Sequence, residues 1–281
     1  TGYGDKAMLR KVGTICAMLT LASFLIIAGC KKRAEQAEKT EGPAKPEYKS
    51  KGDEGTVTGK VSFEGTPPTA KKIDMSQDAK CAAAAGDKTT DDVVITDGKL
   101  GNVYVYLKAA SIDKVSYAAP SDPVVLDQQG CRYHPRTVGL RTGQTLRVVN
   151  SDPTTHNVHP SPKVNQEWNQ SQAEGAPPIE KKFNRKELLI PVKCNQHPWM
   201  KANVGVLDHP YFTVSAKDGT YTIKDVPPGN YTVVFWHETL GEQTASITVG
   251  AKESKTQDMA YKSGAAAAPA SMEIAPTLWL P

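Results

Sequence analysis

Residues 194–200, with the sequence CNQHPWM, bring a thiol, an imidazole and a thioether into seven consecutive positions. Thiolate and imidazole groups suit copper, zinc and iron, whereas two His and one Cys with a weak axial Met form a copper site. Such a site needs a second histidine, and residues 156–159, with the sequence HNVH, supply a candidate. The two motifs indicate neighbouring loops at one end of a β-sandwich. One loop carries Cys, His and Met, and the other supplies a His.

These motifs resemble those of the cupredoxins, the small blue-copper electron carriers. The short loop with Pro198 after the histidine is closest to the amicyanin type. The resemblance covers residues 91–207 and implies one type 1 copper. Carried over by position, the implied ligands are His156, Cys194, His197 and the axial Met200.

The resemblance also implies roles for the residues around the ligands. Asn157 is expected to tie the two ligand loops together and to hold the ligands in orientation. The outer edge of His197 is expected to reach solvent and to serve as the port for electrons, within an apolar patch formed by Pro198 and Trp199. The alternative for Trp199 and Met200 is a plain core position, and for Cys194 a structural thiol.

The N-terminal region has the features of an export signal. Two basic residues, Arg10 and Lys11, precede a mostly apolar run over residues 12–28 that ends at Gly29 and Cys30. This order is typical of a secretory signal. Its ending resembles the lipobox of bacterial lipoproteins, which implies a signal peptide over residues 1–29 and a lipid on Cys30. A transmembrane anchor is the alternative, because the apolar run has the minimum length for a span.

Either interpretation places the rest of the chain outside the cytoplasm, in the cell envelope. A lipid on Cys30 would hold it on the periplasmic side or at the cell surface, and Lys31 favours the outer membrane if the source is Gram-negative. Residues 30–54 are predicted to be a disordered tether, because residues 31–54 contain seven basic and six acidic side chains and almost nothing apolar. Residues 263–281 are predicted to be a disordered tail.

The folded part has three remaining cysteines, Cys81, Cys131 and Cys194, once Cys16 and Cys30 are assigned to the N-terminal region. If Cys194 binds metal, a disulfide between Cys81 and Cys131 is the economical assignment in an oxidising compartment. A disulfide of Cys194 with either of the others is the alternative, and it would abolish the copper site.

The remaining sequence predicts an all-β fold. Short alternating or β-branched runs separated by Gly and Pro turns predict strands, which favours a sandwich. The clearest runs are residues 56–63, 103–107, 124–126 and 145–149. We expect a cupredoxin-like Greek-key β-sandwich over residues 55–207.

Residues 208–262 change in character. The turn at residues 217–219 (KDG) and the connection at residues 226–229 (VPPG) resemble those of the carboxypeptidase regulatory-like, or transthyretin-like, β-sandwich module. The stretch is short for a complete sandwich, and residues 56–63 look like the first strand of the same family. Residues 55–75 are therefore also open to assignment to this second, smaller sandwich, with the copper domain inserted into it or packed against it.

The formal charge of +4 arises from 34 basic and 30 acidic residues, and this near balance gives no case for nucleic-acid binding. No Ser/His/Asp set, carboxylate pair or Gly-rich phosphate loop occurs at a usable spacing, so we do not expect an enzyme. His159 is a rim histidine or assists a second metal. His134, His209 and His237 are expected to be structural.

The expected function is one-electron transfer at the cell envelope, with a cytochrome or an oxidoreductase as redox partner. One alternative is a lipoprotein that stores, delivers or senses copper without transferring electrons. A third possibility is a surface adhesion module whose copper site is vestigial.

Overall fold

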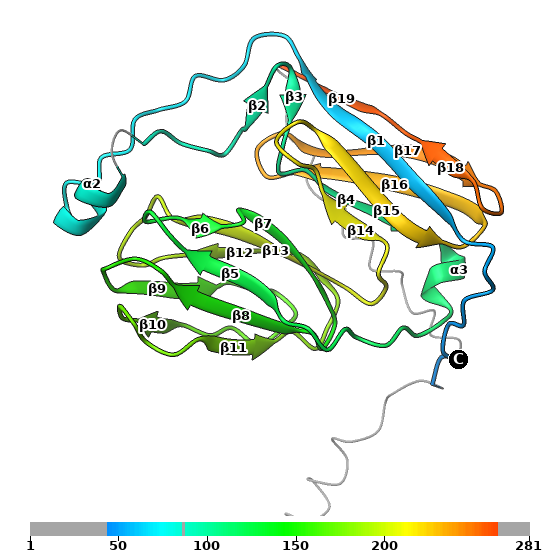
Figure 1. Ribbon diagram of the computed structural model, residues 1–281, viewed down its shortest axis with the longest axis horizontal. Coiled ribbons are helices and arrows are strands. Elements are labelled where there is room, and N and C mark those ends of the chain that lie inside the picture. Colours follow the sequence, from blue (N-terminus) through cyan, green and yellow to red (C-terminus); the bar gives the residue numbers. More distant parts are fainter. Residues whose placement is uncertain (1–43, 86–87, 264–281) are drawn as a thin grey trace, which may run out of the picture. The chain divides into compact units, whose positions relative to one another are not determined.

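The computed structural model describes residues 44–85 and 88–263 (Figure 1). The expected signal peptide over residues 1–29, the lipidation site Cys30, residues 31–43 of the expected tether and residues 264–281 of the expected tail lie outside the described residues. The rest of the expected tether is described, and its Tyr48 N–H donates to the Ser116 carbonyl at 2.8 Å, so the tether is held against the fold at this point. In the part of the chain that is described, no helix has the length and apolar character needed to cross a membrane. The regular secondary structure of the described chain is almost entirely β-strand, which confirms the all-β prediction.

The first sandwich packs two sheets against each other. One sheet has the order β10-β9-β12-β13-β7 and consists of β7 (Thr137–Arg141), β9 (His156–Pro160), β10 (Gln170–Gln172), β12 (Glu187–Lys193) and β13 (Lys201–Leu207). The other has the order β11-β8-β5-β6 and consists of β5 (Val124–Gln128), β6 (Tyr133–His134), β8 (Thr145–Asn150) and β11 (Ile179–Lys182). Alternate side chains such as Leu146, Val148 and Val204 fill the space between the sheets.

The second sandwich also has two sheets. Its first sheet has the order β15-β1-β3-β2, with β18 and β19 added on β1, and consists of β1 (Gly55–Glu64), β2 (Ile95–Thr96), β3 (Lys99–Leu100), β15 (Thr220–Val226), β18 (Ser254–Thr256) and β19 (Met259–Lys262). Its other sheet has the order β14-β4-β16-β17 and consists of β4 (Tyr104–Lys108), β14 (Phe212–Val214), β16 (Gly229–His237) and β17 (Gly241–Val249). Val57, Val105, Phe235 and Tyr261 lie in its core.

Strand pairing places the start and the end of the described chain in the same sandwich. β1 pairs with β15, β18 and β19, and β4 pairs with β14 and β16. The chain leaves this sandwich through the short helix α3 (Ala110–Asp113), builds the first sandwich from β5 to β13, and returns at β14. The copper domain expected over residues 55–207 therefore includes four strands, β1–β4, that pair within the second sandwich. β1 lies within residues 55–75, which the sequence left open to the second sandwich, whereas β2, β3 and β4 were expected in the copper domain.

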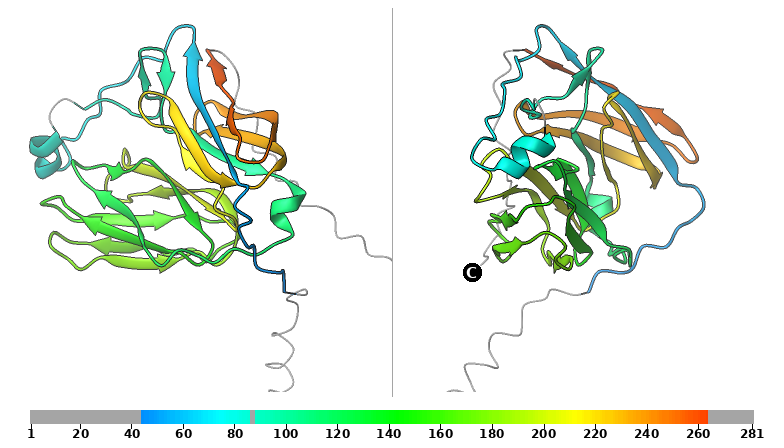
Figure 2. Two further views of the ribbon diagram at one scale, coloured as in Figure 1. Left: turned by 45° about the vertical axis from the view of Figure 1, so that its right-hand side comes forward. Right: turned by 60° about the vertical axis from the view of Figure 1, so that its left-hand side comes forward.

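A long segment between β1 and β2 leaves the second sandwich and reaches one end of the first. It contains the helix α2 (Ala79–Ala85), which lies beside that end in each view of Figures 1 and 2. Met75 and Cys81 from this segment are buried in the core of the first sandwich. We call residues 73–85 the cap.

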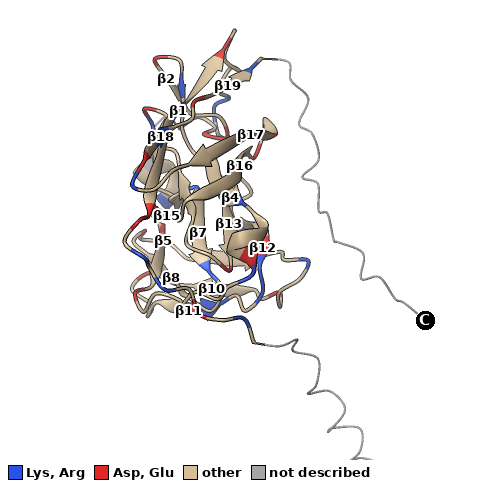
Figure 3. Ribbon diagram, turned by 90° about the vertical axis from the view of Figure 1, so that its right-hand side faces the viewer, with Lys and Arg blue, Asp and Glu red and all other residues tan. Residues whose placement is uncertain are grey.

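Acidic and basic residues are interspersed along the described strands and loops in the view of Figure 3. One ion-pair cluster around the buried Arg136 has a structural role. Arg136, next to β7, pairs with Glu238 after β16 and with Asp91, and thereby links segments of the two sandwiches.

Candidate metal centre

Two loops of the first sandwich carry the predicted ligands. His156 is the first residue of β9, and Cys194 directly follows β12. The loop from Cys194 to β13 is a tight turn, in which the Met200 N–H donates to the His197 carbonyl at 2.9 Å and the Cys194 N–H to the Met200 carbonyl at 3.3 Å. These bonds hold Cys194, His197 and Met200 in one compact loop.

Asn157 joins the two loops at the position where the sequence predicts such a tie. Its backbone N–H donates to Cys194 Sγ at 3.3 Å, and its side-chain oxygen accepts from the Asn195 N–H at 3.2 Å. Both bonds cross from β9 to the Cys194 loop. The spacing between His156 and Cys194 is therefore fixed by protein contacts.

Three of the predicted ligands converge. The Nδ1 atoms of His156 and His197 are 2.9 Å apart, and Cys194 Sγ is 3.6 Å from His197 Nδ1. Ligand atoms of the three residues all lie within 4.8 Å of one another, and all three side chains are buried. Metal bonds to His and Cys are about 2.0–2.3 Å long, so one ion can contact all three atoms. Met200 is fully buried in the same loop.

Hydrogen bonds at this site shift the pKa values of two of the predicted ligands, His156 and Cys194. Burial lowers the pKa of His156, but hydrogen bonds with Asp152 and Cys194 outweigh burial and raise this pKa to about 9. Burial raises the pKa of the Cys194 thiol, but hydrogen bonds with His156 and the Asn157 N–H leave it below its ordinary value. The hydrogen bond between His156 and Cys194 thus shifts the two pKa values in opposite directions. A bound metal would replace the His156 proton, since ligands bind metals in their deprotonated form.

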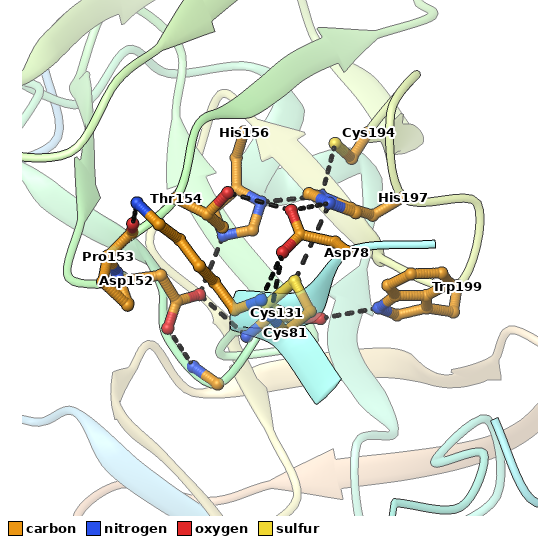
Figure 4. Close-up of a disulfide and its surroundings, with 12 residues drawn as sticks. Asp78, Cys81, Cys131, Asp152, Pro153, Thr154, His156, Cys194, His197 and Trp199 are labelled. Carbon is orange, nitrogen blue, oxygen red and sulfur yellow. Dashed lines mark hydrogen bonds and ion pairs between the residues drawn. A yellow bond between two sulfur atoms is a disulfide. The ribbon is translucent and has the colours of Figure 1, made fainter. Parts of the chain in front are cut away.

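Two carboxylates contact the outer nitrogens of His156 and His197, and neither was predicted from the sequence. Asp152 Oδ2 lies 2.8 Å from His156 Nε2, and Asp78 Oδ2 lies 3.2 Å from His197 Nε2 (Figure 4). Asp152 stands four residues before His156, so its nearness in sequence was a usable signal. Asp78 belongs to the cap, and nothing local in the sequence connects it with His197.

The cap makes one expectation wrong. The outer edge of His197 was expected to reach solvent, but only 3% of His197 is exposed. Asp78 and Cys81 cover its Nε2 atom, with Cys81 Sγ at 3.7 Å, and the Trp199 ring lies 5.2 Å from the His197 ring. The covering segment comes from more than a hundred residues upstream, so the loop sequence could not reveal it.

Cys81 of the cap and Cys131, between β5 and β6, form a disulfide with a Cα–Cα distance of 5.6 Å. Cys194 remains free and buried. The Trp199 indole N–H donates to the Cys131 carbonyl at 3.0 Å, so this partly buried ring packs toward the disulfide, whereas Pro198 is exposed. Trp199 is therefore only partly exposed, and the patch expected from the two residues stays a prediction.

The other histidines lie apart from this group. His159 contacts Glu167 at 2.5 Å and Asn195 at 3.2 Å. The His134 side chain is exposed, and His209 and His237 are buried. Within the described residues, each possible metal-binding group of His, Cys, Asp and Glu contains His156 or His197.

Comparison with known proteins gives a family match and structural similarities. The model of the carboxypeptidase regulatory-like domain matches residues 193–262. This range starts at the last residue of β12 and so includes β13 of the first sandwich together with β14–β19. No curated protein matches the chain.

Two solved copper proteins are similar to part of the chain. Amicyanin from Paracoccus versutus is 23% identical with a TM-score of 0.28, over 31% of this chain and 84% of amicyanin. A Cu-containing nitrite reductase from Thermus scotoductus SA-01 is 18% identical with a TM-score of 0.29, over 33% of this chain and 24% of the reductase. This chain thus spans about a quarter of the reductase. The chain is an all-β protein with a carboxypeptidase regulatory-like match at its C-terminal end and a weak, partial similarity to cupredoxins.

Proposed function

We propose that this chain binds one copper ion and transfers single electrons at the cell envelope. The observation that carries the proposal is the buried convergence of His156 Nδ1, His197 Nδ1 and Cys194 Sγ. Met200 is the proposed weak axial ligand. Copper held by such a set supplies a one-electron couple between Cu(I) and Cu(II).

The ligand types favour copper over the other metals that bind His and Cys. Zinc is bound by Cys, His and carboxylate groups and has no redox chemistry, whereas two His and one Cys with a long axial Met form a copper site. Here the three converging side chains are buried, and a fourth, Met200, is buried in the same loop. A closed ligand set suits electron transfer better than reaction at the metal, so the proposal does not include an enzymatic activity.

Pre-formed ligand positions support the same function. Cys194 accepts a hydrogen bond from Asn157, and each histidine contacts a carboxylate through Nε2. Ligands held by the protein move little when the metal changes charge, which keeps the reorganisation for each electron small. Export, lipid attachment at Cys30 and a redox partner protein of the envelope belong to the proposal.

The decisive experiment is to load the intact protein with Cu(II) and to record visible absorption and EPR spectra. We expect a strong thiolate-to-copper band and a narrow copper hyperfine splitting, with reversible reduction. Zn(II)-loaded protein is the colourless control. A folded protein that takes up no copper would overturn the proposal and favour the adhesion module with a vestigial site.

The axial role of Met200 is tested separately by Met200→Gln. The variant should keep copper and have a lower reduction potential, because a harder oxygen ligand favours Cu(II) over Cu(I). Cyclic voltammetry of the variant beside the wild type measures the shift. An unchanged or higher potential would leave Met200 as a core residue without a role at the metal.

Copper storage is the second candidate, and the buried edge of His197 favours it. A covered histidine removes the direct contact through which a partner could exchange electrons. Electron transfer and copper storage are distinguished by the rate of electron exchange. Fast electron exchange with a small redox reagent, together with slow release of copper to a chelator, indicates electron transfer, whereas slow electron exchange indicates storage.

A further inference from the structure

Both candidate ligand histidines are held through their outer nitrogen by a carboxylate. His156 Nε2 contacts Asp152, and His197 Nε2 contacts Asp78. A carboxylate only accepts hydrogen bonds, so each ring must place a proton on Nε2. In a neutral ring this leaves the lone pair on Nδ1. The two Nδ1 atoms lie 2.9 Å apart, and that of His197 lies 3.6 Å from Cys194 Sγ.

Asp152 is itself rigidly held. It is buried, and its two oxygens accept the N–H groups of Gly130 at 2.6 Å and Cys131 at 2.7 Å. Its position is therefore fixed by the backbone of the loop between β5 and β6. That loop also carries one half of the disulfide.

Asp78 is held in a similar way from the opposite side of the disulfide. Its Oδ1 accepts the N–H groups of Lys80 at 2.8 Å and Cys81 at 3.0 Å at the start of α2, and its Oδ2 accepts the Thr154 hydroxyl at 2.9 Å. Each half of the disulfide thus donates its backbone N–H to one of the two carboxylates. The disulfide joins the two carboxylate supports into one frame (Figure 4).

We propose that Asp78 and Asp152 are positioning residues of the metal centre, which present both Nδ1 atoms to the metal, and that the Cys81–Cys131 disulfide couples their positions. The inference rests on the proposed copper site and adds to it a support that comes from outside the two ligand loops. A carboxylate on Nε2 makes the imidazole a stronger electron donor, which favours Cu(II) over Cu(I).

The test uses Asp78→Asn and Asp152→Asn in the intact protein. Asparagine keeps the size and an oxygen acceptor, and it starts a helix about as well as aspartate does. Loss of such a carboxylate typically lowers metal affinity by about 10–100-fold. Each tenfold loss for Cu(II) that Cu(I) does not share raises the reduction potential by about 59 mV.

Asp74→Asn is the matched control, because Asp74 lies in the same cap and accepts the Ser76 N–H at 2.9 Å without contact to a histidine. Thr154→Val removes one hydrogen bond to Asp78 and should shift the potential in the same direction as Asp78→Asn, by less. The pair Cys81→Ser and Cys131→Ser should reproduce the upward shift of both Asn variants, because both supports loosen.

A second measurement does not depend on copper. Proton–nitrogen NMR of the metal-free protein should show Nε2-bound protons on both histidines that exchange slowly with water. Asp78→Asn should speed exchange at His197, and Asp152→Asn at His156. This readout remains decisive for variants that bind copper poorly.

The outcomes separate the inference from the proposed function. Variants whose copper affinity, potential and ring-proton exchange all match Asp74→Asn would overturn the positioning role, while the copper site stands. A wild type that binds no copper would overturn the proposed function. In that case, fast exchange at either Nε2 proton of the metal-free protein would also overturn the inference, and slow exchange would support the positioning role.

Discussion

Each of the two sandwiches buries a histidine, but the pKa values of the two histidines are shifted in opposite directions. His156 of the first sandwich is 0% exposed and His237 of the second is 1% exposed. Burial lowers the pKa of His237 to about 4, with the charge of Arg136 adding to the effect. The pKa of His156 is raised to about 9, because the hydrogen bonds with Asp152 and Cys194 outweigh burial.

The difference lies in the partners that surround each ring. His237 Nδ1 accepts the backbone N–H groups of Thr239 and Leu240, and its Nε2 has no hydrogen-bond partner among the described residues. His156 has a carboxylate, a thiol and a second imidazole. A buried histidine alone is a structural residue, and convergent donors make it a candidate ligand.

We expect the largest effect from Cys194→Ser, which removes the only free thiol of the described chain and with it a partner of His156. The visible thiolate-to-copper band should disappear completely, while the far-UV circular dichroism of the β fold is retained. His237→Gln, at a buried histidine of the other sandwich, is the control and should leave the band unchanged. Persistence of the band in Cys194→Ser would remove Cys194 from the site.

Within the described residues, only the first sandwich carries a cap joined by a disulfide. The double variant Cys81→Ala with Cys131→Ala tests how much this bond stabilises the folded protein. The bond joins residues 50 positions apart, and closing a loop of that length stabilises the folded state by about 4 kcal/mol in the chain-entropy model. We expect the free energy of unfolding, measured in denaturant, to fall by that amount. A loss below about 1 kcal/mol would mean that core contacts of the cap suffice without the bond.

The two histidines also predict opposite effects of pH on the metal-free protein. The folded-state pKa of His156, about 9, exceeds the ordinary 6.5, so its stabilising contribution is complete below pH 6.5 and is lost as pH rises through 9. The folded-state pKa of His237, about 4, lies below 6.5, so stability falls as pH drops from 6.5 toward 4.

Unfolding of wild type, His156→Gln and His237→Gln in denaturant across this pH range measures both contributions. His156→Gln should flatten the alkaline side of the stability profile and His237→Gln the acidic side. Equal changes on both sides in either variant would contradict the contrast between the two rings.

Gly205→Ala tests the packing at a place where the two sandwiches are in contact. A Cβ atom at Gly205 of β13 would lie 2.6 Å from the ring of Tyr104 of β4, and such overpacking costs about 1–3 kcal/mol. At Gly229 the nearest atoms would be at 3.4 Å, so Gly229→Ala is the control and should cost less. Equal unfolding midpoints for the two variants would show that the Tyr104 ring can shift without loss of stability.

Much of the candidate site was visible in the sequence because its parts are local. Cys194, His197 and Met200 occupy one loop, and Asn157 stands beside His156, so their types and spacing indicated the chemistry. The alternation of apolar residues likewise predicted an all-β fold. Asp152, four residues before His156, could have been found by asking which nearby carboxylate would hold the ring.

The sequence by itself determined the donor types, their grouping in two loops and the β class, since these depend on neighbours along the chain. Only the tertiary structure decided that β2–β4 join β1 and the C-terminal strands, that the cap covers His197, and that Asp78 faces its ring. Strand partners and covering segments are chosen by burial and hydrogen bonding between residues far apart in sequence. In the sequence, Asp78 looks like any surface carboxylate, and only the fold brings it to the candidate metal centre.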